Sequence, residues 1–138
     1  MKVKMSVRRW AWVMGMSIIV SAAAAAPTFD FRDYDNDLMR DLDRTIKYFE
    51  PDITARNADA AKEDLDLLAE GFRYTEDYFS KKSGADDAVE LSRKGAKIIA
   101  DVRGLIDSAD FEAAAAAARE TPNVCKSCHD VYKPRLAR

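Results

Sequence analysis

Residues 58–80, ADAAKEDLDLLAEGFRYTEDYFS, decide the fold class of this chain. Apolar or small side chains recur there at steps of four and three residues, at Ala61, Leu65, Leu68, Phe72, Thr75 and Phe79. This spacing is typical of a helix that buries one side in a bundle of helices. Asn57 is a suitable N-cap for this helix, and the pair Lys81-Lys82 followed by Gly84 is typical of a helix end. The segment is therefore predicted to be one long helix.

Two further stretches have the helical period, and no stretch alternates long enough to predict a strand. The first is residues 34–49, which Pro51 is expected to end. The second is residues 86–107, which contains Gly95 and Gly104. Glycine lowers helix stability, so we expect each of these two residues to mark close contact with a neighbouring helix.

A fourth helix is expected to begin after Asp110, a suitable N-cap, and to pass through the alanine run Ala113–Ala118. The Thr121-Pro122 pair interrupts it, because proline is unfavourable inside a helix but suited to its first turn. We expect a kink or a restart there, with Thr121 capping a last segment that runs to about Lys133. Short connections favour antiparallel neighbours, so the sequence predicts an all-α, up-down-up-down four-helix bundle.

The composition agrees with a single packed domain. The chain has 138 residues, of which 48% are hydrophobic and 33% charged, which argues against disorder. It contains 5 glycines and 4 prolines, too few for a fold rich in β-turns. With 2 cysteines and 1 histidine it is neither a disulfide scaffold nor a multi-histidine metal protein.

Residues 1–26 have the three parts of a secretory signal peptide. Residues 1–9 carry only positive charges, Trp10–Val20 are apolar, and a run of small residues follows. We expect cleavage within residues 23–25, leaving residues 27–138 as a single domain in the periplasm. The alternative is a retained membrane anchor, for which the apolar stretch falls short of the roughly 20 residues that a spanning helix needs.

Cleavage would change the charge of the protein. The full chain has 22 Lys and Arg against 24 Asp and Glu, and the four bases of the signal peptide leave 18 against 24, a net charge near −6. Such a chain is unsuited to nucleic acid and suggests a partner with a basic surface, bound more weakly as salt rises. Cleavage also removes four of the 5 methionines, so that Met39 is the one that stays.

The stretch Cys125–His129 is C-x-x-C-H, the attachment signature of a c-type haem. Two thiols at positions i and i+3 of a helix lie on one face, where both can reach the vinyl groups of one porphyrin. His129 follows directly and can turn its imidazole toward the iron. Three alternatives are a structural disulfide, a thioredoxin-like redox pair and a zinc site. The first leaves the histidine unexplained, the second lacks a preceding strand, and the third lacks ligands.

With the motif near the end of the chain, the sequence resembles the cytochrome c′ family, the class II c-type cytochromes. The resemblance rests on Cys125–Lys133, CKSCHDVYK, and on the helix pattern of the whole mature chain. It implies an antiparallel four-helix bundle with one covalent haem c, no other metal, and His129 as the proximal ligand. The aromatic residue and the base that usually follow the motif are matched by Tyr132 and Lys133. Lys133 is expected near the imidazole or a haem propionate, or alternatively as a solvated cation at the helix end.

Two features depart from the family pattern. The connection between the second and third helices is short, and Pro122 falls where the haem-bearing helix is often continuous. The second departure bears on the tilt of the segment that would hold the haem.

Met39 resembles the distal iron ligand of the low-spin branch of that family, such as cytochrome c-556, where a methionine early in the first helix occupies this place. The alternative is that Met39 fills space in the core. A thioether ligand raises the reduction potential and blocks small gases, whereas an apolar side chain leaves the iron five-coordinate. Leu38, Leu42 and Phe72 are expected to shape the distal pocket.

The predicted function is that of an exported electron carrier with one haem, and not of an enzyme. Nothing in the sequence resembles a pair of catalytic carboxylates, a Ser/His/Asp triad or a phosphate-binding loop. One alternative is a five-coordinate protein that binds or scavenges the diatomic gases NO and CO, and another is a helical interaction module without haem. The redox partner is not identified by the sequence, and the family suggests a homodimer through the first two helices.

Overall fold

The computed structural model describes residues 29–133, and the predicted signal peptide lies outside them. The described elements are five α-helices with no strand among them: α1 (Asn36–Thr54), α2 (Ala58–Ser80), α3 (Asp86–Asp107), α4 (Phe111–Ala118) and α5 (Thr121–Tyr132). This confirms the all-helical fold class. None of the helices in this range combines the length and the hydropathy needed to cross a bilayer.

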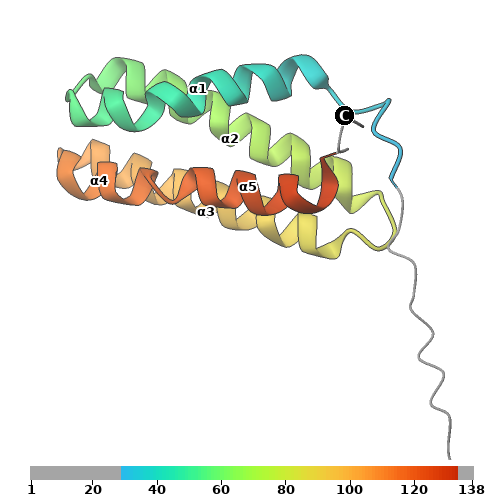
Figure 1. Ribbon diagram of the computed structural model, residues 1–138. Helices are drawn as coiled ribbons and strands as arrows, with labels where there is room; N and C mark the ends of the chain where they lie inside the picture. The colour runs from blue at the N-terminus through green and yellow to red at the C-terminus, as the bar shows by residue number, and fades with distance from the viewer. Residues whose placement is uncertain (1–28, 134–138) are drawn as a thin grey trace, which may run out of the picture.

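The helices pack side by side, as expected for a helical bundle (Figure 1). Figure 1 shows α4 and α5 following one another along one side of the molecule. α2 packs against α1 and α3, α4 packs against the same two helices, and α5 packs against α3. Among the described helices, α1 and α5 have no comparably close packing. The chain thus leaves room between α1 and the end of the molecule that holds α5.

The first helix extends beyond the predicted range. It begins at Asn36, where the Asp35 side chain caps the first turn by accepting from two backbone N–H groups. The prediction that Pro51 ends it was wrong, because the helix continues to Thr54. A proline inside a helix costs about 3 kcal/mol. Ile53, which follows it, is fully buried, and burying such a side chain stabilises the fold by roughly 1.5–3 kcal/mol, which offsets most of that cost.

The second and third helices match their predicted bounds. Asn57 caps α2 as predicted, accepting a hydrogen bond from the backbone of Ala60. Gly95 lies in close contact with α2, as predicted, but Gly104 has no heavy atom within 4 Å of where a Cβ would be. The expectation for Gly104 was therefore wrong: this residue is exposed on the outer side of α3.

The break between α4 and α5 is a kink, one of the two predicted forms. Asp110 caps α4 by accepting from Ala113, as predicted. Thr121, however, caps nothing: it is the first residue of α5, fully buried, and its hydroxyl has no hydrogen-bond partner in the described chain. The reason is that Glu120 before it keeps helical dihedral angles, so no extended residue is present to act as a side-chain cap.

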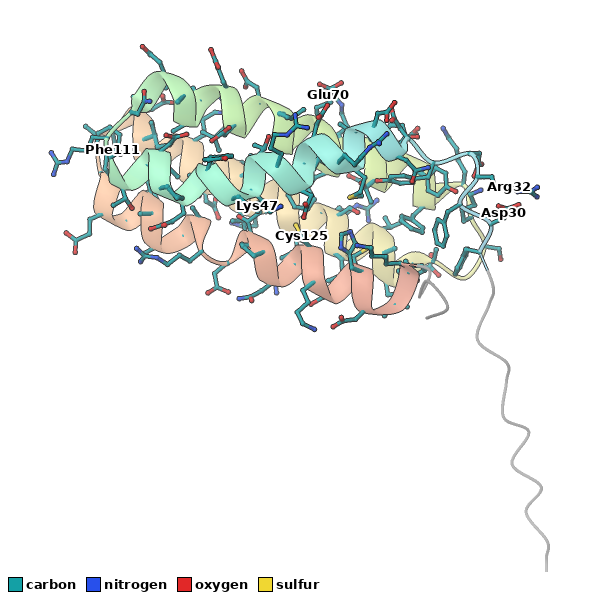
Figure 2. The ribbon with its side chains drawn as sticks, turned by 45° about the horizontal axis from the view of Figure 1, so that its top comes forward. Asp30, Arg32, Lys47, Glu70, Phe111 and Cys125 are labelled. Atoms are coloured by element: carbon teal, nitrogen blue, oxygen red, sulfur yellow. The ribbon has the colours of Figure 1, made fainter. Side chains whose placement is uncertain are left out.

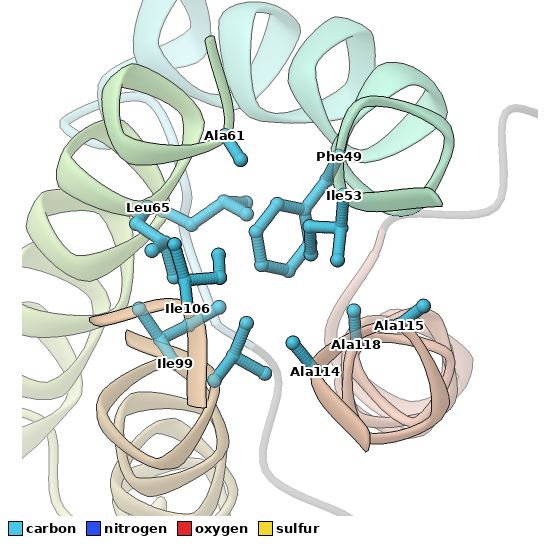
Figure 3. Close-up of a cluster of buried hydrophobic side chains, with 11 residues drawn as sticks. Phe49, Ile53, Ala61, Leu65, Ile99, Ile106, Ala114, Ala115 and Ala118 are labelled. Carbon is cyan, nitrogen blue, oxygen red and sulfur yellow. The ribbon is translucent and has the colours of Figure 1, made fainter. Parts of the chain in front are cut away.

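The buried side chains form two clusters. Figure 3 shows the first, the central core, in which short alanines of α4 face larger side chains of α1, α2 and α3: Phe49, Ile53, Ala61, Leu65, Leu68, Ile99, Val102, Ile106, Ala114, Ala115 and Ala118. The second, the aromatic cluster, joins the ends of α2, α3 and α5: Tyr78, Phe79, Ala85, Ala88, Val89 and Tyr132. Phe29, Phe31, Tyr34, Tyr74 and Cys128 pack against the aromatic cluster.

The partly buried carboxyl group of Asp64 should make the stability of the fold depend on pH. One of its carboxylate oxygens is buried without a hydrogen-bond partner within residues 29–133, and burial, with Asp52 and Glu63 nearby, raises the pKa to about 6. The folded state therefore favours the protonated acid, so stability falls as pH rises from about 4 to about 6. Asp64→Asn should raise the free energy of unfolding at pH 7 by a few tenths to about 1 kcal/mol, allowing for solvent screening.

Urea unfolding at pH 4 and pH 7 measures this effect. The gain from Asp64→Asn should be present at pH 7 and clearly smaller at pH 4, where the folded state holds the proton and the unfolded state still holds it in part. The matched control is Glu70→Gln, an exposed acid on the same helix, which should leave stability unchanged. An equal effect of both substitutions at pH 7 would show that net charge, and not the buried oxygen, is responsible.

Candidate cofactor site

α5 holds the three residues of the C-x-x-C-H motif on one side. Cys125, Cys128 and His129 are all half-buried, and neither cysteine is in a disulfide. Val124 and Tyr132 on the same helix are buried and fix it against the bundle, whereas Lys126 and Ser127 are exposed. The helix thus presents two thiols and an imidazole inward from less than two turns of chain.

These three side chains line one cavity of about 670 Å³, within the roughly 300–1,000 Å³ that is usual for ligand-binding sites. The cavity lies between the central core and the aromatic cluster, and side chains of both form its walls. Figure 2 shows the Cys125 side chain on the side of α5 that faces α1. The walls are mainly apolar and come from the segment before α1 and from all helices except α4: Phe31, Tyr34, Leu42, Ile46, Leu68, Phe72, Phe79, Leu91, Val124 and Tyr132.

The other predicted site residues fall into two groups. Met39, Leu42 and Phe72 line the cavity, as do Tyr132 and Lys133, so α1 and α2 bring their predicted residues to the same space as α5. Leu38 is half-buried and is not among the residues that line the cavity. This follows from the helix period, since Leu38 lies about 100° around α1 from Met39.

Two glycines shape the walls in a way that the helix pattern did not reveal. A Cβ on Gly71 would lie 2.4 Å from the Leu42 side chain, and one on Gly95 would lie 2.1 Å from the Phe72 ring. Both distances are far below van der Waals contact, so two cavity-lining side chains pack where only glycine leaves room. Gly95 could be suspected from the sequence as a costly glycine inside a helix, but its partner could not.

Burial changes the chemistry of the two thiols. It raises the pKa of Cys125, and it raises the pKa of Cys128 to about 11, with the Cys125 thiol and Asp87 acting in the same direction. Both cysteines therefore stay protonated near neutral pH. Coordination of a free metal ion requires thiolates, so each cysteine would have to lose its proton to bind one.

The pKa of His129 is lowered, whereas those of the two cysteines are raised. Burial, and then the positive charge of Lys133, lowers the pKa of the imidazole, while Asp43 and Asp130 oppose this shift. The imidazole is thus neutral at pH 7 and has a lone pair available for a metal. In the described residues no group of three or more Cys, His, Asp or Glu side chains is placed to bind a metal ion by itself.

The cavity fits a haem in four respects. It has ligand size and apolar walls, and two protonated thiols stand at i and i+3 on one helix. A neutral imidazole lies next to them, and a thioether from Met39 enters from another helix. The two glycines add a fifth observation, because they withdraw bulky side chains from the space that a flat macrocycle would take.

Comparison with known proteins gives no independent support. No protein-family model, no curated protein and no solved structure matches the chain.

Thiol reactivity offers a test of the site. At pH 8 the thiolate fraction of Cys128 should be about 100-fold lower than that of an exposed cysteine, because its pKa rises from near 9 to about 11. Alkylation of the reduced, haem-free protein should therefore be slow, and it should become fast for both cysteines in urea. Circular dichroism checks that the helices are present in the slow sample. Equally fast alkylation with the helices intact would contradict the buried placement of the thiols.

Proposed function

We propose that this protein is an exported c-type cytochrome that holds one haem c covalently and carries single electrons between partner proteins. The observation that supports this most is the shared cavity: Cys125, Cys128 and His129 line it from α5, and Met39 lines it from α1. The resemblance to class II c-type cytochromes, which rests on the motif and the helix pattern, supports the same function. In this proposal the helices alternate in direction as an antiparallel four-helix bundle.

The chain would attach the haem through its two thiols. Each thiol would add across one vinyl group, so that the sulfur would bond to one vinyl carbon, the thiol proton would go to the other, and the double bond would become single. No oxidant or reductant is consumed, so reduced cysteines are the only requirement on the protein side. Both cysteines are free thiols in the described chain, and burial raises the pKa of each.

The remaining residues would set how the cofactor works. When bound, haem supplies an iron that takes up and releases one electron. His129 and Met39 would hold that iron through a neutral imidazole and a thioether, and a thioether ligand favours a high reduction potential. The apolar walls, Leu42 and Phe72 among them, exclude water and so limit the rearrangement that accompanies a change of charge. The partner would present a basic surface, because the mature chain is acidic.

Covalent attachment can be tested by producing the full chain in cells with c-type cytochrome maturation. The purified protein should show a mass increase of one haem and stay coloured after denaturation, because thioether bonds survive unfolding. Substituting both Cys125 and Cys128 by Ala should abolish this bound colour. The matched control is Ser127→Ala, an exposed residue between them, which should keep it. Colourless wild-type protein with two titratable thiols would overturn the proposed function.

Met39→Ala tests the second axial ligand. The oxidised wild-type protein should have a low-spin spectrum with a methionine-to-iron charge-transfer band, and the ferrous form should react poorly with CO. Met39→Ala should lose the band, become high-spin and bind CO readily, since its thioether no longer competes with the gas. Leu38→Ala is the control, because Leu38 is the adjacent residue and does not line the cavity.

A wild-type protein that is already high-spin and binds CO would favour the gas-binding function in place of electron transfer. An unchanged spectrum in Met39→Ala, with low-spin iron in the wild type, would remove Met39 from the site while leaving the covalent haem in place.

A further inference from the structure

The Phe72 ring of α2 packs directly over Gly95 of α3. A Cβ on Gly95 would lie 2.1 Å, 2.4 Å and 2.5 Å from three carbons of this ring. The glycine is buried in the middle of a 22-residue helix, where glycine costs roughly 0.5–1 kcal/mol relative to alanine. A glycine at this position leaves room for the Phe72 ring to pack against α3.

The ring borders both open space and the packed interior. Phe72 is half-buried: it lines the cavity, and it also packs against the central core. Core packing is dense and yields little, because protein interiors are packed as closely as organic crystals. A methyl group on Gly95 would therefore displace the ring toward the cavity.

The cavity is where a displaced ring would interfere with the site. His129 lines it from α5 and Met39 from α1, so Phe72 on α2 shares the walls with both proposed iron ligands. Leu42, one turn after Met39, is likewise packed over a glycine, Gly71, next to Phe72 in the chain. The two glycines thus make room for two bulky side chains on the walls of the cavity that Met39 also lines.

We propose that Gly95 is a positioning residue for the site: it holds the Phe72 ring against α3 and so leaves the space that Met39 needs to reach the iron. This inference rests on the proposed function, because it concerns how the second ligand gains access. It assigns to one glycine the choice between the six-coordinate and the five-coordinate form. The side chain that would act on the iron's surroundings is Phe72, and Gly95 acts only through it.

Three variants of the full chain, produced with covalent haem, test this. Gly95→Ala should lose the methionine-to-iron charge-transfer band and bind CO in the ferrous form. Adding Phe72→Leu to Gly95→Ala should restore the band, because leucine lacks the ring atoms that meet the new methyl group. Gly104→Ala is the matched control: it lies in the same helix with open space around it, and it should keep the band while raising the urea midpoint.

The readouts separate positioning from stability. Mass spectrometry gives the haem bound per chain, the visible spectrum gives the ligation, and urea unfolding gives the stability of the same samples. A band retained in Gly95→Ala would overturn the inference while leaving the proposed function intact. A band lost in Gly95→Ala and not restored by Phe72→Leu would also overturn it, because the effect would then not pass through the ring.

Two further outcomes are decisive. If Gly95→Ala does not fold and the double variant folds with the band present, the inference is supported, since relief of the same contact restores both. If neither folds, it is overturned, because the glycine would serve the backbone packing of α3 and not Phe72. Wild-type protein without covalent haem would be a failure of the proposed function, seen before any of these variants is compared.

Discussion

The structure depends on a difference between α4 and α5, which follow one another along one side of the bundle: their inward side chains differ in how fully they fill the space between the helices. Along α4 the inward residues are alanines, and Ala114, Ala115 and Ala118 are buried against α1 and α3. Such short side chains let the helices approach closely, and they are part of the buried central core. Along α5 two cysteines and a histidine line a cavity that their side chains do not fill. One half of the bundle is therefore packed, and the other half encloses a cavity.

The break between α4 and α5 lets both helices lie along the same side of the bundle. Arg119 and Glu120 keep helical dihedral angles, and α5 follows α4 along the same side of the molecule (Figure 1). Pro122 lacks an N–H group and therefore sits where a helical hydrogen bond is not required. α5 then packs against α3, and the cavity opens on its side toward α1. Local backbone chemistry thus sets where close packing ends and where the site begins.

The aromatic cluster lines the cavity through Phe79 and Tyr132 and ties α5 to the rest of the fold. The Tyr132 hydroxyl donates a hydrogen bond to Asp87 at the start of α3. The centroid of the Tyr132 ring lies 4.8 Å from that of the Phe79 ring on α2. Tyr34 bonds to Thr75 at 2.8 Å, which joins the segment before α1 to α2. Since both tyrosines line the cavity, the contacts that stabilise this end also hold its walls in place. An aromatic wall of this kind suits a flat, apolar cofactor.

Much was determined by the sequence alone, because helix periodicity and capping act between residues close in the chain. The bounds of α2 and α3, the caps Asn57 and Asp110 and the break near Pro122 could be predicted for this reason. The motif in α5 also predicted which side chains share a face, since that depends only on the helix period. Pro51 was misjudged because the burial of Ile53, a tertiary term, offsets the local cost of proline.

Only the tertiary structure decided what the helices place against one another. That Met39 lines the same cavity as the motif, while its neighbour Leu38 does not, follows from how α1 is rotated about its axis. Gly95 and Gly104 look alike in the sequence, yet one lies under the Phe72 ring and the other faces open space. The physical reason is that packing contacts join residues distant in the chain, and a periodic pattern specifies the side that is buried without specifying its partner.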